Sequence, residues 1–346
     1  MLLSIIYFIL ILGTIVLVHE FGHFFFAKLF GVYVYEFAIG MGPKILSHKS
    51  KKSETTYSLR LIPIGGFCQL AGEGIEEDEK LPKEKLLQSK PVWQRFLIMF
   101  FGAGNNFILA ILVLFLISLI WGAPSTSNKI AGVEEGSPVE IAGILKGDKI
   151  IGINGNTVKT LDDLQLYLTI SGEEETTFKI LRDNKEYEFK VTPLKDIEAE
   201  EKGYTFGVQF ENKVSHGFVS SIKYAFVKTW SLMRQLVITL KELFTGGVGI
   251  NDLSGPVGIY TVVDQTRGTG FANILYLLAL LCINVGFINL LPFPAFDGGR
   301  IVFLLIEKIM GKPVKAETEN LIHNIGFFLL LGLIIYITIH DVLRLF

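Results

Sequence analysis

The stretch LLSIIYFILILGTIVLVHEFGH, residues 2–23, joins an uncharged apolar run to two histidines and a glutamate. If residues 19–30 continue the helix of residues 2–18, the segment reaches the roughly 20 residues that a hydrocarbon core about 30 Å thick requires. No lysine or arginine precedes the run, and no small-x-small site precedes HEFGH, so a cleaved signal peptide is disfavoured. The stretch predicts a first membrane span that carries ionisable side chains.

Three further runs have a similar character. They cover residues 96–121, 274–291 and about 321–339, and none contains Asp, Glu, Lys or Arg. Half of the 346 residues are hydrophobic, which also favours a membrane protein over a soluble one. We therefore expect a polytopic α-helical membrane protein with four transmembrane helices.

The charged residues and the cysteines argue against other classes of protein and of site. The formal net charge is -2 and the basic residues are spread along the chain, so no nucleic-acid partner is expected. Cys68 and Cys282 are far apart, and the second lies inside an apolar run. They support neither a disulfide framework nor a thiolate metal site.

Basic residues between the runs predict the orientation. Residues 28–95 are rich in lysine, and the segment 300–315 is also basic. Lysine and arginine accumulate on the cytoplasmic side, so both segments are expected there. The amino terminus and residues 122–270 are then expected outside the cytoplasm.

The long outer segment begins with a small folded domain. Its apolar alternation and turn signals predict a helix over 161–170 and strands over 176–182 and 187–194, around a turn at Asp183 and Asn184. The string GSPVEIAGILKGDKIIGINGNTV, residues 136–158, resembles a PDZ domain, in which an extended peptide adds to a sheet edge. A small domain without a ligand is the alternative.

An amphipathic helix is expected after this domain. Apolar residues recur near every fourth position from Phe218 to Phe244, with lysines and an arginine beside them. This pattern is typical of a helix at the membrane surface. A buried helix of the outer domain is the alternative.

The opening stretch contains a metal-site pattern. His19 and His23 are four residues apart, so on a helix both can direct a ring nitrogen at one ion, with Glu20 beside them. This HExxH arrangement is that of zinc hydrolases, where the glutamate is the general base for a water activated by the metal. Ionisable side chains at membrane depth are functional candidates by default, because they are costly unless coordinated.

A third ligand is expected from NLLPFPAFDGGR, residues 289–300. Asp297 follows the third apolar run, and Pro292 and Pro294 should break the helix there. Broken backbone at membrane depth is tolerated where it is buried or lines a wet cavity. His323 and His340 are the alternatives for this ligand, but each stands alone, so both are interpreted as membrane-interface or packing histidines.

Together these motifs resemble the site-2 proteases, most closely the bacterial RseP type, which are peptidase M50-like intramembrane zinc metalloproteases. The resemblance covers nearly the whole chain. It includes residues 33–72, similar to the family's membrane-associated β-hairpin region, as well as GAGNNFILA at 102–110 and LSGPVGI at 253–259. Phe296 and Ala103 depart from the usual Leu and Pro, and the chain has one PDZ-like domain where some relatives have two.

The resemblance assigns roles to individual residues. It implies Zn²⁺ ligands at His19, His23 and Asp297, and a catalytic base at Glu20. The implied substrate-binding residues are Asn289, Pro292, Pro294 and Asn106.

The expected organisation has four parts. Residues 1–121 hold transmembrane helices 1 and 2, residues 122–212 the PDZ-like domain, residues 213–270 the interfacial helix and linker, and residues 271–346 transmembrane helices 3 and 4. The resemblance implies a multi-pass protein of the bacterial inner membrane, with an extracytoplasmic PDZ-like domain and an active site toward the cytoplasm.

The implied function is hydrolysis within transmembrane segments, after a first extracytoplasmic cut. Single-span membrane proteins, such as anti-sigma factors, or signal-peptide remnants would be the substrates. An inert membrane scaffold that recruits partners through the PDZ-like domain is the alternative, and a transporter with broken helices is a weaker one because the first half has no matching broken helix.

Overall fold

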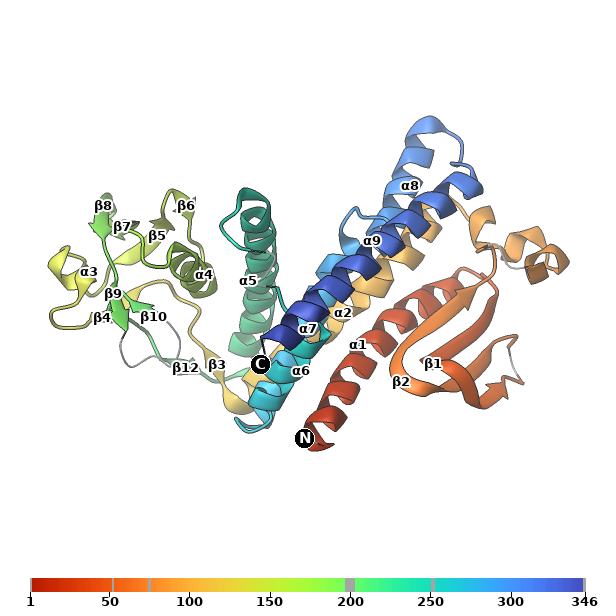
Figure 1. The fold of residues 1–346 in the computed structure, drawn as a ribbon, viewed down its shortest axis with the longest axis horizontal. Helices are drawn as coiled ribbons and strands as arrows, with labels where there is room; N and C mark the ends of the chain where they lie inside the picture. Colours follow the sequence, from red (N-terminus) through yellow and green to blue (C-terminus); the bar gives the residue numbers. More distant parts are fainter. Residues whose placement is uncertain (1, 52, 74–75, 197–202, 250–252, 345–346) are drawn as a thin grey trace. The chain divides into compact units, whose positions relative to one another are not determined.

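The computed structural model describes residues 2–51, 53–73, 76–196, 203–249 and 253–344. The chain forms two compact units. The membrane unit comprises Met1–Val113 and Ile250–Phe346, and the insert unit comprises Leu114–Gly249. In Figure 1 the membrane unit is red to orange and cyan to blue, and the insert unit is mostly yellow to green.

Four helices are long and apolar enough to cross a membrane, which confirms the four expected spans. Their bounds are α1 (Leu2–Leu29), α2 (Val92–Trp121), α7 (Phe271–Leu290) and α9 (Ala316–Leu343). Helices α2 and α9 begin before their apolar runs, because the more polar residues ahead of each run also form helical turns. None of the four contains a proline.

The membrane unit also contains two shorter α-helices. Helix α6 (Pro256–Thr266) begins with proline, and the buried Asp341 carboxylate accepts the N–H groups of Gly255 and Gly258 at 2.9 Å each. A carboxylate is favourable at a helix amino terminus, so α9 caps α6. Helix α8 (Asp297–Met310) begins after Pro292 and Pro294, and the expected break at these prolines is confirmed.

A long β-hairpin lies beside α1 (Figure 1). Strand β1 (Val34–Lys49) pairs antiparallel with β2 (Thr56–Leu70), so the expected hairpin forms. A Cβ atom at Gly66 would lie 3.6 Å from the Val16 side chain, which brings β2 into contact with α1. The 3₁₀ helices η1 (Glu76–Lys80), η2 (Lys83–Lys85) and η3 (Leu87–Ser89) then lead to α2.

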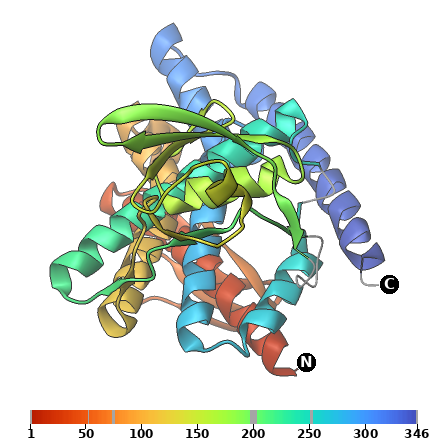
Figure 2. The same cartoon turned by 90° about the vertical axis from the view of Figure 1, so that its left-hand side faces the viewer.

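The insert unit is an α+β fold, shown in Figures 1 and 2. Its elements are β3 (Ala123–Pro124), β4 (Ile130–Val133), α3 (Pro138–Ile141), β5 (Lys149–Ile153), β6 (Asn156–Thr157), α4 (Leu161–Ser171), β7 (Thr176–Arg182), β8 (Lys185–Val191), β9 (Leu194–Asp196), β10 (Gly203–Thr205), β11 (Val208–Phe210), β12 (Val214–Ser215) and α5 (Phe218–Thr245). The main sheet has the order β6-β5-β7-β8, and β4 pairs with β11, β9 with β10 and β3 with β12.

The local sequence explains these elements. Asp183 and Asn184 both have positive φ, 50° and 61°, as a two-residue type I′ hairpin turn requires. Strand β8 ends at Val191, earlier than the expected residue 194, and the nearby Pro193 lacks the N–H needed to continue a ladder. Phe178 and Leu164 are fully buried between the sheet and α4.

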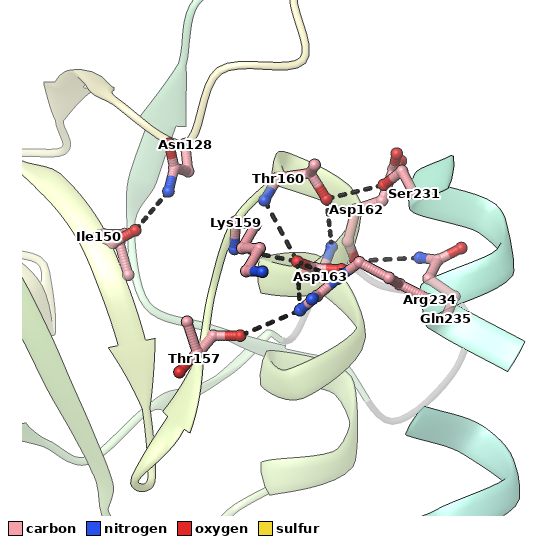
Figure 3. A network of polar contacts seen from close by, with 10 residues as sticks. All are labelled: Asn128, Ile150, Thr157, Lys159, Thr160, Asp162, Asp163, Ser231, Arg234 and Gln235. Carbon is pink, nitrogen blue, oxygen red and sulfur yellow. Dashed lines mark hydrogen bonds and ion pairs between the residues drawn. The ribbon is translucent and has the colours of Figure 1, made fainter. Parts of the chain in front are cut away.

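A polar network joins α4 to α5 (Figure 3). Thr160 and Asp163 form a capping box at the start of α4, and the buried Asp163 carboxylate also pairs with Arg234 at 3.1 Å. Lys228 pairs with Asp162 at 2.5 Å. The polar side of α5 therefore faces α4.

The opposite side of α5 is apolar. Ile222, Phe226 and Trp230 are 38%, 58% and 58% exposed. The expected amphipathic helix is confirmed as a helix, and its polar side, together with the buried Ile238, packs against the rest of the insert unit.

The network predicts that Asp163→Ala loosens the α4–α5 contact. The change removes the helix cap and leaves a half-buried guanidinium without its carboxylate, a loss of about 2–4 kcal/mol. Hydrogen exchange of the α4 amides in the full chain should accelerate.

The control for this variant is Glu175→Ala. It breaks the exposed pair with Lys190 and should leave exchange in α4 unchanged. Unaltered exchange in Asp163→Ala would contradict the stabilising role of the network.

Candidate metal centre

Two histidines on α1 bring their ring nitrogens together. His19 and His23 are one helical turn apart, and their Nε2 atoms lie 3.2 Å from each other. Gly22 lies at the crossing of α1 and α2, where a Cβ atom would lie only 1.9 Å from the Phe101 carbonyl oxygen. The two backbones are therefore in direct contact, which only glycine at position 22 permits.

Asp297 completes a group of three. This first residue of α8 places Oδ2 at 3.3 Å from His19 Nε2 and 3.4 Å from His23 Nε2. Ligands of a tetrahedral zinc ion at about 2.0–2.1 Å are roughly 3.3 Å apart, so these three atoms fit the edges of such a site. They are the group that could hold a metal ion among the described residues.

Asp297 supplies the carboxylate of the group, and only 15% of its side chain is exposed. Two nitrogens and one carboxylate oxygen are a donor set typical of catalytic zinc, which leaves a position open.

The backbone around the site orients one histidine. His23 Nδ1 lies 2.8 Å from the Ile98 carbonyl oxygen, and only a protonated Nδ1 can donate to a carbonyl. This contact leaves the lone pair of Nε2 directed at the site. A metal-binding histidine is oriented in the same way, because its other ring nitrogen donates to a carbonyl or carboxylate group. His19 Nδ1 is buried and has no hydrogen-bond partner among the described residues.

Glu20 lies at the same place. Its carboxylate lies close to the side chains of His23, His19 and Asp297 and to the backbone of Cys68 in β2. The predicted base is thus next to the predicted ligands. Its contact with β2 was not expected from the sequence, because strand pairing does not show which amide faces α1.

Gly102 on α2 provides space at the centre. A Cβ atom there would lie 2.3 Å from His23 Nε2 and 3.0 Å from Asp297 Oδ2. The string GAGNNFILA contains this glycine, but nothing in the string itself indicates that the missing side chain leaves room for a metal ion.

The other predicted site residues are not in the group of three. Asn106 on α2 is fully buried, and neither atom of its amide has a hydrogen-bond partner among the described residues. Asn289 is half-buried in the last turn of α7. Pro292 and Pro294 lie in the turn between α7 and α8.

Comparisons with known proteins decide the family. The sequence model of the family described as Peptidase family M50 matches residues 7–333 of this chain. The chain belongs to this family. One M50 relative is a Clostridium perfringens protein named as a zinc metalloprotease. Its sequence is 37% identical to this chain, and the match covers 98% of both chains. Two others are zinc metalloprotease RasP of Bacillus licheniformis and regulator of sigma-W protease RasP of Bacillus subtilis, which are 34% and 33% identical over 99% of both chains.

The M50 chain is accordingly a metallopeptidase of the site-2 protease type, and the recognition made from its motifs is confirmed. It is also a multi-pass membrane protein, with four helices able to cross a membrane.

The geometry predicts that Gly102→Ala weakens metal binding. The new methyl group would overlap His23 Nε2 in the site, so zinc affinity should fall by more than about 10-fold, as when groups around metal ligands are changed. Chelator competition on the purified protein measures this affinity.

Gly104→Ala on the same helix is the matched control. Its Cβ atom would meet only ring atoms of Phe100 and Phe101 at 3.2 Å or more, which can yield. Equal zinc affinity in both variants would show that Gly102 provides no room for the metal.

Proposed function

We propose that this M50 chain hydrolyses peptide bonds within membrane-spanning segments of other proteins, at a zinc ion held by His19, His23 and Asp297. The observation that carries the proposal is the triangle of ligand atoms, 3.2–3.4 Å apart, two of which belong to α1, a helix long and apolar enough to cross a membrane. Such side chains are stable at that depth when they coordinate an ion.

The residues of the chain divide the chemistry between them. Zinc, when bound, would act as a Lewis acid and lower the pKa of water to about 7. Glu20, beside the backbone of Cys68, takes the proton from the attacking water and delivers it to the leaving amide nitrogen. His23 keeps its Nε2 lone pair available through its contact with the Ile98 carbonyl.

A helical substrate must unwind before its carbonyl groups can be reached, because they are bonded within the helix. We assign this step to the region around the broken α7–α8 connection. Asn289 offers an amide that can bond freed backbone groups, and Pro292 and Pro294 keep the connection extended. Strands β1 and β2 form a two-stranded sheet, and an unwound substrate segment can pair with its edge as an added strand. Asn106 supports the site from α2.

The insert unit is proposed to be a PDZ-like domain that filters or binds the outer part of substrates. Its support is a groove of about 380 Å³ between α4 and the segment that contains β10 and β11. The groove is lined by Leu168, Thr169, Gly172, Tyr204, Thr205, Phe206, Gly207, Val208 and Phe210. Among the described residues, β11 pairs with β4 alone, so an added strand has an edge available.

The groove predicts a difference between two exposed positions on α4. Thr169→Arg places a long side chain in the groove and should weaken binding of an extended peptide that matches a trimmed outer segment by about 10-fold or more. Gln165→Arg, one turn earlier and outside the lining, should bind normally. Fluorescence anisotropy on the full chain distinguishes them, and equal binding would count against this groove.

The proposed orientation places the basic segments 28–95 and 300–315 in the cytoplasm and residues 122–270 outside, in the bacterial inner membrane. The apolar side of α5 then lies on the extracytoplasmic face of the inner membrane. A cysteine introduced at Lys83 should resist a membrane-impermeant thiol reagent in intact cells, whereas one at Lys185 should react. Labelling in the opposite sense would reverse the topology.

The substrates are proposed to be single-span proteins or signal-peptide remnants whose outer part has already been removed. The Bacillus subtilis relative carries the name regulator of sigma-W, which supports a substrate of the anti-sigma-factor class. A catalytically inert scaffold would need no intact base.

Glu20→Gln therefore tests the mechanism. It removes the base and leaves all three ligands, so cleavage of a tagged, pre-trimmed single-span substrate should fall by about 10²–10⁴-fold while the zinc content stays unchanged. Purified protein in detergent serves for both measurements. Equal cleavage by both forms would show that Glu20 is not the base.

A further inference from the structure

The turn that carries Asp297 has an unusual backbone. Between α7 and α8, the Phe296 N–H donates to the Phe293 carbonyl at 3.2 Å and closes a tight turn. Pro294 and Ala295 are its central residues, and Ala295 has φ 82°. This matches a type II turn, which favours proline first and normally glycine second. Alanine in that conformation is strained and depends on support from outside the turn.

The turn receives little support from its own side chains. Phe296 is the N-cap residue of α8 and supplies no side-chain hydrogen bond. Gly298 and Gly299, which follow Asp297, are buried close to the backbone of residues 290–294 and have no side chains to contribute. The position of Asp297 is therefore sensitive to what packs against Pro294 and Ala295.

His323 on α9 supplies a specific contact. The Ala295 N–H donates to His323 Nδ1 at 3.0 Å. The second ring nitrogen, Nε2, is buried, has no hydrogen-bond partner among the described residues and lies 4.0 Å from Glu319 Oε1. Because Nδ1 accepts this bond, the proton of the neutral ring is on Nε2.

Gly326 supplies a second contact from the same face of α9. It follows His323 by three residues, so both point to one side of the helix. A Cβ atom at Gly326 would lie 2.4 Å from Pro294 Cβ and 2.7 Å from the Pro294 carbonyl oxygen. Helix α9 thus approaches the turn closely at Pro294 and bonds it at Ala295.

We propose that His323 is a positioning residue for the metal centre, which acts through the Ala295 amide on the backbone that carries Asp297. Gly326 allows the close approach that this bond needs. The inference rests on the proposed role of Asp297 as a ligand, and it gives His323 a role beyond that of a packing or interface histidine. It makes α9 a structural part of the active site although α9 provides no ligand.

Metal affinity tests this role without reference to cleavage. In His323→Leu the Ala295 amide loses its acceptor, so the zinc dissociation constant of the full chain should rise about 10–100-fold, and the visible spectrum of the Co²⁺ form should change. His323→Asn places an acceptor oxygen near the position of Nδ1 and should recover most of the affinity. Gly326→Ala should weaken zinc binding as His323→Leu does.

His340→Leu is the matched control. His340 lies on the same helix, also with a buried Nδ1 that has no partner among the described residues, and 17 positions along a helix correspond to about 25 Å. It should bind zinc normally and give the parent Co²⁺ spectrum.

The outcomes separate this inference from the proposed function. If Asp297→Ala loses zinc while His323→Leu keeps the parent affinity and spectrum, the positioning role is wrong and the ligand assignment stands. If Asp297→Ala binds zinc normally, the ligand assignment itself is wrong. Equal losses in His323→Leu and His340→Leu, or no recovery in His323→Asn, would reveal general damage to α9 and overturn the positioning role.

Discussion

Direct backbone contact between α1 and α2 is the constraint on which the metal centre depends. At Gly22 the helices meet without an intervening side chain, and at Gly102 the missing side chain leaves room beside His23 and Asp297. A side chain at either position would push the helices apart or fill the site. The packing of α1 against α2 therefore also determines the geometry of the candidate metal site.

The functional side chains are held by backbone groups rather than by other side chains. The Ile98 carbonyl orients His23, and the backbone of Cys68 lies beside Glu20. The Ala295 amide connects the Asp297 turn to His323. Four segments far apart in the sequence, α1, β2, α2 and the α7–α8 turn, thus define one centre, and α9 supports it from outside.

The sequence predicts much of this arrangement because its signals are local. Apolar length predicts the four spans, HExxH predicts two candidate ligands and a candidate base on one helix, and the prolines before Asp297 predict the helix break. The type I′ turn at Asp183 and Asn184 follows from two adjacent residues that tolerate positive φ.

The features that the sequence does not predict depend on contacts between distant segments. Nothing near Gly102 shows that His23 will lie against it, and nothing near His323 shows that Ala295 will adopt positive φ. The same limit applies to α5. Its periodicity indicates an apolar and a polar face, but it does not show that carboxylates of α4 will form ion pairs with the polar face. Tertiary contacts decide these cases.

Fixing the two histidines through the helix crossing also has a consequence for how the sequence can vary. Phe21 and Phe25 on α1 are about half exposed, at 48% and 49%, and by helical spacing they lie on the side of the helix away from His19 and His23. Any apolar residue can occupy such positions without moving the histidines, because the crossing is set elsewhere. The outer surface of α1 is thus free to adapt to lipid thickness and composition while the chemistry inside stays constant.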